Sequence, residues 1–428
     1  MTCQGQLGSG AESSTPGPTV TKIEPDRPLP YGRHLIEDDD VAAVVAALRS
    51  DWLTTGPAVR AFEDALASRV GAAHAVSCSS GTAALHLAAL ALGLGPGDRA
   101  VVPAITFVAT ANVIRHTGAD VLFADCDPET GLMTADGFEA ALEQAGHLGG
   151  PPVRAVLPVH FAGQCTDLDA IWEIAGRQDI AVVHDAAHAI GTGYQIGSER
   201  FSAGGLRHAT MAAFSFHPVK TIAMGEGGAV TTDDPMLAQR LVRLRNHGLN
   251  RDPEAFENPS LAFDSVGRAN PWYYELAEPG LNYRASDLHC ALGVSQLAKL
   301  DRMVARRAAL VARYDRHLAR FAPRIRPLGR IPGCVPAWHL YVALVDFDAA
   351  GVDRARVMAG MAEAGITTMV HYLPVHMQPY YRGLYGAQDL PGALAYYRQA
   401  LSLPLFPAMA DADVDRVTGT LARALGLD

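Results

Sequence analysis

The chain has 428 residues and a mass of 45.3 kDa, more than one ordinary hydrophobic core accommodates, so we expect two packed domains. Its 49% hydrophobic and 19% charged residues exclude a disordered or fibrous protein and indicate a globular one. The net charge of -10, with no basic stripe and no Lys/Arg run, argues against a nucleic-acid partner.

The N-terminal residues 1–28 are rich in Gly, Ser, Thr and Pro and lack an apolar period, so we expect a disordered tail. No run of about 20 apolar residues occurs and no signal-peptide pattern opens the chain, which predicts a cytoplasmic protein without a membrane partner. Six cysteines lack CxxC spacing, and we expect them to be buried free thiols: Cys3, Cys78, Cys126, Cys165, Cys290 and Cys334.

Residues 36–49 and 58–70 carry apolar side chains at helical spacing and predict two amphipathic helices. Beyond Ala75, short apolar runs alternate with helical segments. The runs predicted as strands are AVSC, RAVVP, VLFADCD, RAVLPVH, IAVVHD and ATMAAFSF. Strands separated by helices indicate parallel pairing, and therefore an α/β fold with a mainly parallel central sheet covered on both faces. Such sheets bind ligands at the carboxyl ends of their strands.

The C-terminal third follows a different pattern. A polar stretch at residues 250–272 interrupts the regular alternation, and a long helix is expected over residues 286–321, beginning at a Ser cap. The remainder holds a strand (HLYVALVDF), a helix and a Pro-rich aromatic passage. We therefore predict a large α/β domain at 29–285, followed by a linking helix and a smaller α+β domain at 286–428.

The first chemically informative segment is CSSGTAAL, in which Ser80, Gly81 and Thr82 follow a strand and open an Ala/Leu-rich helix. Small residues let the backbone approach a ligand closely, and free N–H groups at a helix start offer a phosphate site. By itself such a segment is more often an ordinary helix cap.

The second segment is HDAAHA, which puts Asp185 at the carboxyl end of a strand. A carboxylate in this position acts as a metal ligand, as a general base or as the partner of a protonated heterocyclic nitrogen. No third ligand stands at zinc-like spacing, so no metal is expected. A purely structural aspartate stays open on this segment alone.

The third segment is FSFHPVKTIAMGEGGAV, where Ser215, His217 and Lys220 follow another buried strand and precede a Gly-rich turn. A lone lysine among apolar residues is often a surface lysine with a buried stem. A partly desolvated amine, in contrast, has the lowered pKa that Schiff-base chemistry requires.

In combination, a phosphate cradle, a strand-end aspartate and a lysine follow the chain order of fold-type I pyridoxal-phosphate enzymes, the fold of aspartate aminotransferase. The sequence here resembles the DegT/DnrJ/EryC1/StrS family of nucleotide-sugar aminotransferases, over about residues 30–425. The resemblance rests on these segments: WLTTGP, SSGTAAL, PAITFVATANV, DAAHA, FSFHPVKTIAMGEGGAV, LRNHG and LNYRASDLHCALGVSQL.

The resemblance implies a role for each matching residue. Lys220 is expected to form the Schiff base with pyridoxal 5'-phosphate and to move protons, and Asp185 to keep the pyridine nitrogen protonated. His188 matches the residue beside the phenolic oxygen. Phe107 matches the aromatic side chain that stacks on the cofactor ring, although a core phenylalanine would look the same.

The resemblance also implies phosphate contacts from Ser80, Gly81, Thr82 and Ser215. Asn282 of LNYRASD matches an asparagine that the neighbouring subunit donates, which implies a homodimer with shared active sites.

The chain retains lysine where some members have histidine and act as dehydratases, which favours transamination. The resemblance implies glutamate as the amino donor. The nearest similarity is to enzymes that aminate C4 of a UDP-linked 4-keto-6-deoxy-N-acetylhexosamine on the route to pseudaminic acid. A GDP- or dTDP-linked keto-deoxysugar is the alternative substrate. Substrate contacts are expected from five residues, for each of which simple packing is the alternative: Tyr31, His339, Tyr341, His371 and His376.

Two other classes of function are compatible with an α/β fold of this kind. A non-catalytic ligand-binding or regulatory protein with this fold would be favoured by loss of Lys220 or Asp185, and the chain keeps both. A nicotinamide-dependent reductase would suit the α/β order, but no GxGxxG follows the first strand.

Overall fold

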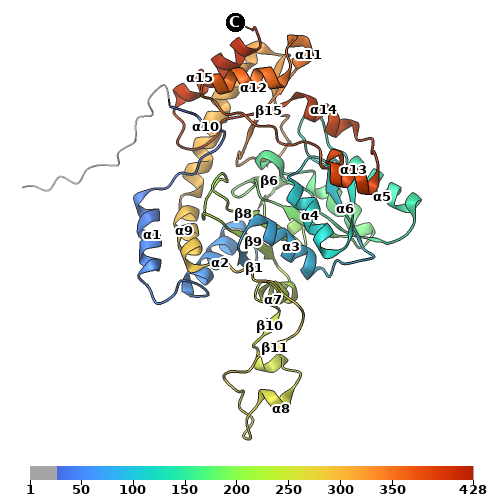
Figure 1. The fold of residues 1–428 in the computed structure, drawn as a ribbon, viewed down its shortest axis with the longest axis vertical. Helices are drawn as coiled ribbons and strands as arrows, with labels where there is room; N and C mark the ends of the chain where they lie inside the picture. The colour runs from blue at the N-terminus through green and yellow to red at the C-terminus, as the bar shows by residue number, and fades with distance from the viewer. Residues whose placement is uncertain (1–26, 428) are drawn as a thin grey trace, which may run out of the picture.

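The computed structural model describes residues 27–427. Cys3 and all but the last two residues of the expected tail lie outside the described residues. A seven-stranded sheet forms the centre of the molecule, in the order β1-β9-β8-β5-β4-β2-β3 (Figure 1). Strand β9 runs antiparallel to both neighbours and the other pairs are parallel, which confirms a mainly parallel sheet. The strands are β1 (His74–Cys78), β2 (Arg99–Pro103), β3 (Asp120–Ala124), β4 (Val153–Val156), β5 (Ala181–Asp185), β8 (Met211–Ser215) and β9 (Gly228–Thr232).

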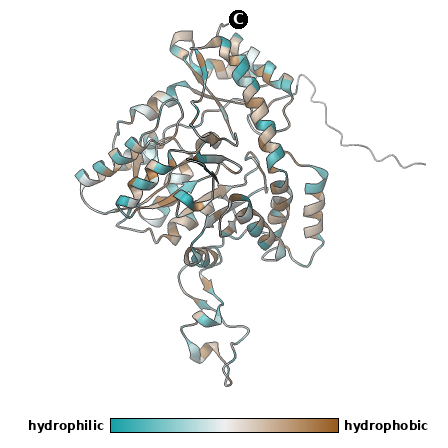
Figure 2. Ribbon diagram, turned by 180° about the vertical axis from the view of Figure 1, so that it is seen from behind, coloured by the Kyte–Doolittle hydropathy of each residue, from teal (hydrophilic) through white to brown (hydrophobic). Residues whose placement is uncertain are grey.

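Helices cover both faces of this sheet because neighbouring residues of each strand point to opposite sides. One buried cluster joins the sheet to α3 (Gly81–Ala91), α4 (Val108–Thr117) and α7 (Pro235–Leu244). On the other face, two clusters join it to α2 (Pro57–Val70), α5 (Ala135–Leu148), α6 (Leu168–Arg177) and α9 (Asp287–Ala298). Hydrophobic and hydrophilic residues alternate along these helices, as expected for elements with one buried face (Figure 2).

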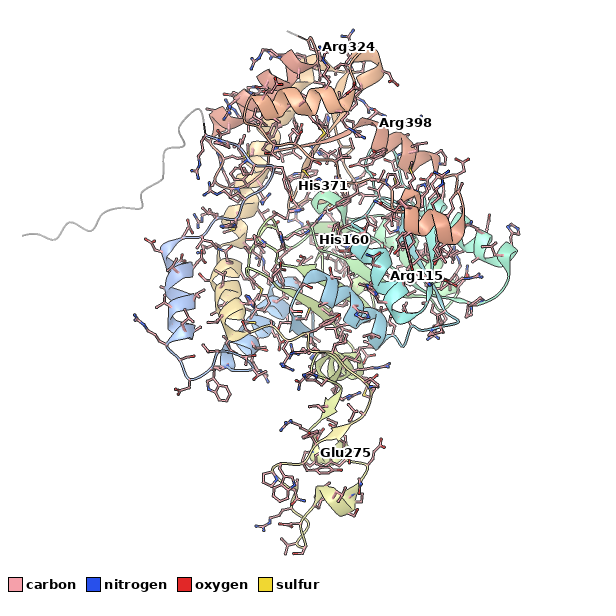
Figure 3. All side chains as sticks on the ribbon, in the orientation of Figure 1. Arg115, His160, Glu275, Arg324, His371 and Arg398 are labelled. Carbon is pink, nitrogen blue, oxygen red and sulfur yellow. The ribbon has the colours of Figure 1, made fainter. Side chains whose placement is uncertain are left out.

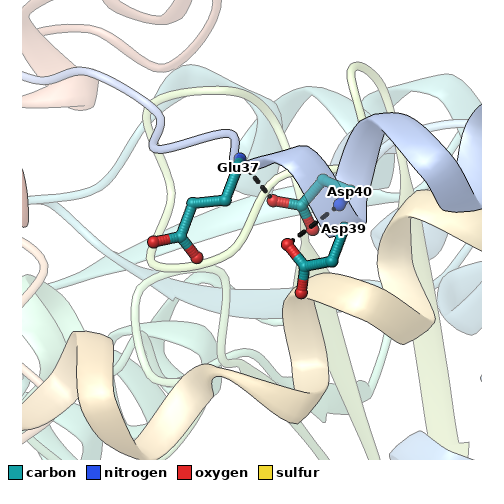
Figure 4. Close-up of side chains that lie close together, drawn as sticks. All are labelled: Glu37, Asp39 and Asp40. Carbon is teal, nitrogen blue, oxygen red and sulfur yellow. Dashed lines mark hydrogen bonds between the residues drawn. The ribbon is translucent and has the colours of Figure 1, made fainter. Parts of the chain in front are cut away.

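The long helix expected over residues 286–321 is interrupted. Ser286 caps α9 as expected, but α9 ends at Ala298 and α10 (Leu300–Leu318) begins after Lys299. The Lys299 ammonium lies 2.6 Å from the Asp39 carboxylate and 2.7 Å from that of Asp40. Both acids belong to the start of α1 (Asp38–Leu48), where Glu37, Asp39 and Asp40 cluster (Figure 4). The break therefore coincides with an ion-pair network that holds α1 against α9.

A smaller antiparallel sheet, β12-β14-β15, lies beyond α10. It packs with α10, α12 and α15 around a separate buried cluster, and Figure 1 shows these helices together at one end of the molecule. Leu29 joins this cluster through hydrogen bonds to Gly365 and Thr367. The elements are β12 (Ile325–Pro327), β14 (Tyr341–Val345), β15 (Ala400–Leu403), α11 (Phe347–Ala350), α12 (Arg354–Glu363), α13 (Pro379–Tyr385), α14 (Pro391–Gln399) and α15 (Asp411–Ala424). The domain boundary at residue 285 stays a prediction.

The polar stretch near residues 250–272 belongs to an arm that projects from the opposite end of the molecule (Figure 1). It contains β10 (Leu249–Asn250), α8 (Pro259–Ala262) and β11 (Glu275–Leu276), and β10 pairs with β11. A third small sheet is formed by β6 (Gly193–Ile196), β7 (Glu199–Ser202) and β13 (Cys334–Val335). Within residues 27–427 no helix is both long and apolar enough to span a membrane.

Candidate active site

The three motifs meet at one edge of the large sheet. Strands β1, β5 and β8 are mutually parallel and end at Cys78, Asp185 and Ser215. Their carboxyl ends therefore lie side by side, and the segments that follow them carry the chemistry. This edge is where parallel α/β sheets bind ligands.

The helix that follows β1 forms a cradle for an anion. Ser80 caps α3, its hydroxyl accepting a hydrogen bond from the Ala83 N–H at 3.1 Å. A Cβ added at Gly81 would lie 2.6 Å from Cβ of Ser215, so the glycine lets the helix start touch the end of β8. The first-turn N–H groups of a helix have no intrahelical partner and attract phosphate.

Asp185 is buried at the end of β5, and each of its carboxylate oxygens accepts one hydrogen bond. Its Oδ2 accepts a hydrogen bond from the Thr110 hydroxyl at 2.7 Å, and its Oδ1 accepts one from the Ala187 N–H at 3.1 Å. Burial raises the pKa of this carboxyl, against the smaller lowering effects of those hydrogen bonds and of Lys220. A cationic N–H group beside it would compensate for that cost.

Lys220 is one of only three lysines in the sequence, with Lys22 and Lys299. Lys299 is engaged by the acidic cluster of α1. Burial lowers the pKa of Lys220 from 10.5 to about 8, while the Asp185 carboxylate pulls it upward. About a tenth of this amine is therefore neutral, and so nucleophilic, at pH 7, far more than for a lysine with an ordinary pKa.

His188 lies beside Asp185 and Lys220. Burial first and the Lys220 charge second hold its pKa well below the usual range, so the ring is neutral. Its Nδ1 accepts the Ala162 N–H at 3.4 Å, which leaves the proton on Nε2, 3.2 Å from the Tyr372 oxygen. The ring thus donates to Tyr372, whose own O–H stays available to a ligand.

Two further histidines border the same space. The His339 ring lies 4.3 Å from that of His188, and its Nδ1 has no hydrogen-bond partner among the described residues. His371 is bonded through Nδ1 to Ser402 at 2.8 Å, and burial together with the Lys220 charge lowers its pKa to about 4. Figure 3 labels His371 and His160 in the middle of the molecule, between the large sheet and the C-terminal helices.

Phe107 stands at the start of α4 with 55% of its surface exposed. Its ring centre is 6.1 Å from that of Tyr372. The exposed face can accept a flat ring.

These residues together fit pyridoxal phosphate. The α3 cradle suits its phosphate, Asp185 its ring nitrogen, Phe107 its ring face and Lys220 its aldehyde. The residues present therefore suit a pyridoxal-phosphate enzyme, in which Lys220 and Asp185 would hold the cofactor.

The structure separates the five expected substrate contacts. Tyr31, with its ring centre 5.6 Å from that of His371, and His339 border the site with His371. Tyr341 is instead buried in the C-terminal core, stacked on Tyr314 and bonded to Asp315. Packing, the alternative to a substrate contact, accounts for this position, because β14 turns the side chain toward α10.

His376 also lies apart from the histidines around Lys220. It is buried near Phe123, with ring centres 6.2 Å apart, and near Asp125 at the end of β3. Its neighbours are thus those of the sheet edge at β3, and packing accounts for its position.

Asn282 is exposed at the base of the arm, and its backbone pairs with Asn246. The next residue, Tyr283, accepts a hydrogen bond from the Ser79 N–H at 2.8 Å in the same chain.

Three residues of the site escaped the sequence analysis. Thr110 lies within the PAITFVATANV segment and Tyr372 is next to His371, but only the fold shows that they form hydrogen bonds with Asp185 and His188. A Cβ on Gly228 would lie 2.2 Å from the Ser80 carbonyl oxygen, so the start of β9 must be glycine. The Gly-rich turn after Lys220 was the available signal.

The model of the DegT/DnrJ/EryC1/StrS aminotransferase family matches residues 34–422, and the chain belongs to this family. It is accordingly a pyridoxal-phosphate-dependent aminotransferase, as the motifs and the site geometry indicate.

Individual relatives agree over nearly the whole chain. The spore coat polysaccharide biosynthesis protein SpsC of Bacillus subtilis is 41% identical over 392 residues, covering 91% of this chain and 95% of SpsC. Helicobacter pylori PseC, an aminotransferase involved in the biosynthesis of pseudoaminic acid, superposes with a TM-score of 0.82 at 26% identity, covering 94% and 100% of the two chains. The sugar aminotransferase Spr1654 of Streptococcus pneumoniae, described as putative, gives 0.79 at 28% identity in its PLP form, covering 93% and 99%.

Proposed function

We propose that the protein transfers an amino group from glutamate to a nucleotide-linked keto-sugar. The most specific form of the proposal is amination of C4 in a UDP-linked 4-keto-6-deoxy-N-acetylhexosamine. The observation that supports aminotransfer is that Lys220 and Asp185 lie near the α3 cradle at one edge of the large sheet. The structural similarity of the whole chain to PseC supports the UDP-linked substrate. The likeness to SpsC, a polysaccharide biosynthesis protein, does not single out one nucleotide, so a sugar on GDP or dTDP stays the second candidate.

The chemistry divides between the cofactor and the chain. When bound, pyridoxal phosphate supplies an electron sink that acidifies a C–H bond of the attached substrate. The Asp185 carboxylate holds the proton of the ring nitrogen, and the neutral fraction of Lys220 takes up a proton at Nζ and returns it. His188 stays neutral and orients Tyr372, while His339 and His371 line the space in which the sugar is placed.

We also propose a homodimer in which Asn282 completes the partner's phosphate site. The exposed position of Asn282 supports this arrangement. So do exposed apolar side chains on the arm, which a second copy would cover: Leu261, Val266, Trp272, Tyr274 and Leu276.

The test is a substrate panel. Purified protein with glutamate is offered UDP-, GDP- and dTDP-linked 4-keto and 3-keto sugars, and amino-sugar products are identified by mass spectrometry and NMR. We expect the UDP-linked 4-keto-6-deoxy-N-acetylhexosamine to react fastest and to gain its amine at C4. A faster GDP or dTDP substrate would transfer the assignment to the second candidate, and amination of none of them would reject the nucleotide-sugar proposal.

A further inference from the structure

Two cysteines that are 169 residues apart in the sequence meet outside the cofactor site. Cys165 follows the loop that carries His160, and Cys334 lies in β13. The backbone N–H of Cys165 donates a hydrogen bond to Sγ of Cys334 at 3.4 Å, and the two side chains lie in one apolar cluster. Both sulfurs are free thiols.

The pair is accessible to a small solute. Cys165 is buried, but Cys334 is partly exposed. Both line a cavity of about 390 Å³, together with Tyr194, Ile331 and Asp167. A molecule as small as a peroxide therefore reaches Cys334 first.

The two thiols are not equivalent. Hydrogen bonds from the Cys165 thiol and from the Cys165 N–H lower the pKa of Cys334, although burial opposes them. The Cys334 thiol and burial together hold the pKa of Cys165 well above its usual range. A thiolate is the form of cysteine that attacks peroxides. Burial raises the pKa of Cys78 and Cys290 to about 12, which leaves them unreactive.

We propose that Cys334 and Cys165 form a peroxide-reactive dithiol, with Cys334 as the attacking and Cys165 as the resolving cysteine. The Cys334 thiolate attacks one oxygen of hydrogen peroxide, the O–O bond breaks, and hydroxide leaves. The sulfenic acid formed on Cys334 is then attacked by the Cys165 sulfur, which releases water and closes a disulfide. Two thiols lose two electrons in total, and one peroxide is reduced to two waters.

The proposed disulfide has two consequences. It converts Cys334 to a form that a thiol reductant restores, before further peroxide oxidises it irreversibly to a sulfinic acid. It also ties the loop of Cys165 to the segment that leads to His339. These segments are already in contact, because Ile331 donates to Gln164 at 3.2 Å and Gly163 packs against Ala337.

The test uses the holoprotein carrying Cys3→Ser, which removes the one cysteine outside the described residues. The protein is treated with hydrogen peroxide, its remaining thiols are alkylated, and its peptides are mapped by mass spectrometry. We expect a Cys165–Cys334 disulfide that dithiothreitol reverses, and before oxidation an alkylation rate at Cys334 at least about tenfold above that of Cys126. Both thiols surviving the peroxide, or direct conversion of Cys334 to sulfinic acid, would overturn the proposal.

Variants separate the two roles. Cys334→Ser should leave Cys165 reduced, and Cys165→Ser should allow Cys334 to proceed to sulfinic acid at the same peroxide concentration. The matched control, Cys126→Ser, removes a buried thiol elsewhere in the protein and should leave the disulfide unchanged. If Cys334 formed a disulfide as readily in Cys165→Ser as in the control, it would be pairing with another thiol, and the assignment would be contradicted.

Discussion

Lys220 and Asp185 influence each other's protonation, and each is shifted mainly by burial. Burial favours the neutral amine at Lys220 and the neutral acid at Asp185, whereas their mutual attraction favours both charges. A change in the charge of one of these two groups therefore shifts the pKa of the other. Burial and the neighbouring carboxylate are what distinguish Lys220 from an ordinary surface lysine.

The pH dependence of cofactor capture tests this reading. Only the neutral amine reacts with an aldehyde, and because the pKa of Lys220 is lowered to about 8, the neutral fraction rises with pH through about 8. Stopped-flow absorbance should show that the apoprotein captures pyridoxal phosphate about tenfold more slowly for each pH unit below that midpoint.

The Asp185→Asn variant is the control. Removing the carboxylate removes the attraction that raises the pKa of Lys220, so the midpoint should move to lower pH. Turnover should fall by roughly two orders of magnitude or more, because an amide cannot hold the ring nitrogen protonated. A midpoint near 10.5 in the native protein would show that Lys220 is an ordinary exposed lysine.

At the scale of elements, the cradle depends on how closely β9 approaches the start of α3. A Cβ on Gly228 would lie 2.2 Å from the Ser80 carbonyl oxygen, and backbone must move to admit it. Gly228→Ala should therefore weaken pyridoxal-phosphate binding by at least about tenfold, measured by fluorescence titration of the apoprotein. Gly176→Ala is the matched control, since no atom lies within 4 Å of the added carbon. Unchanged affinity in Gly228→Ala would show that the close approach of β9 to α3 does not shape the phosphate site.

The break between α9 and α10 makes a separate prediction about stability. The Lys299 side chain, 10% exposed, neutralises Asp40, whose side chain is fully buried. Lys299→Met should lower the free energy of unfolding by about 3 kcal/mol, because a buried carboxylate loses its counter-charge. Arg302→Met removes the exposed partner of Glu37 and should cost less than about 1 kcal/mol. Equal shifts in urea midpoint for the two variants would contradict this account.

The elements show what local sequence determines. Apolar runs and small polar caps located the strands that end at Asp185 and Ser215, and located the starts of α3 and α9, because both signals act over a few residues. The direction of β9 and the break at Lys299 depend on partners far away in the chain, and no local pattern encodes them.

The site divides in the same way. Sequence motifs predict four residues of the site: Lys220, Asp185, His188 and Phe107. Tyr372 is recognised only in the structure, through its hydrogen bond with His188. Tyr341 was named among the substrate contacts from the resemblance, with packing as its alternative. The face of β14 that buries it is decided by packing on α10.

At the scale of the whole molecule, the arm and Asn282 predict that two subunits complete each other's sites. Lys220→Ala and Asn282→Ala proteins, each impaired alone, should recover activity when their subunits exchange. Random exchange should restore roughly a quarter of native activity, because half the dimers are mixed and each has one intact site.

A second mixture controls for non-specific recovery. Lys220→Ala mixed with Asp185→Asn combines two defects that both belong to a subunit's own site, so no intact site arises. Recovery in the first mixture alone supports the shared site. Failure of the first mixture, with exchange verified by native mass spectrometry, would assign Asn282 to its own subunit, where Tyr283 already contacts Ser79.

The central claim is that Lys220 carries the cofactor, and covalent mapping tests it most directly. Borohydride reduction fixes the cofactor to the amine that holds it, and the sequence has only three lysine side chains, Lys22, Lys220 and Lys299. After digestion, we predict the pyridoxyl phosphate group on the Lys220 peptide, with the other two lysines unmodified and no label in Lys220→Ala. Label on Lys22 or Lys299, or a cofactor-bound protein in which Lys220 stays unlabelled, would contradict the account.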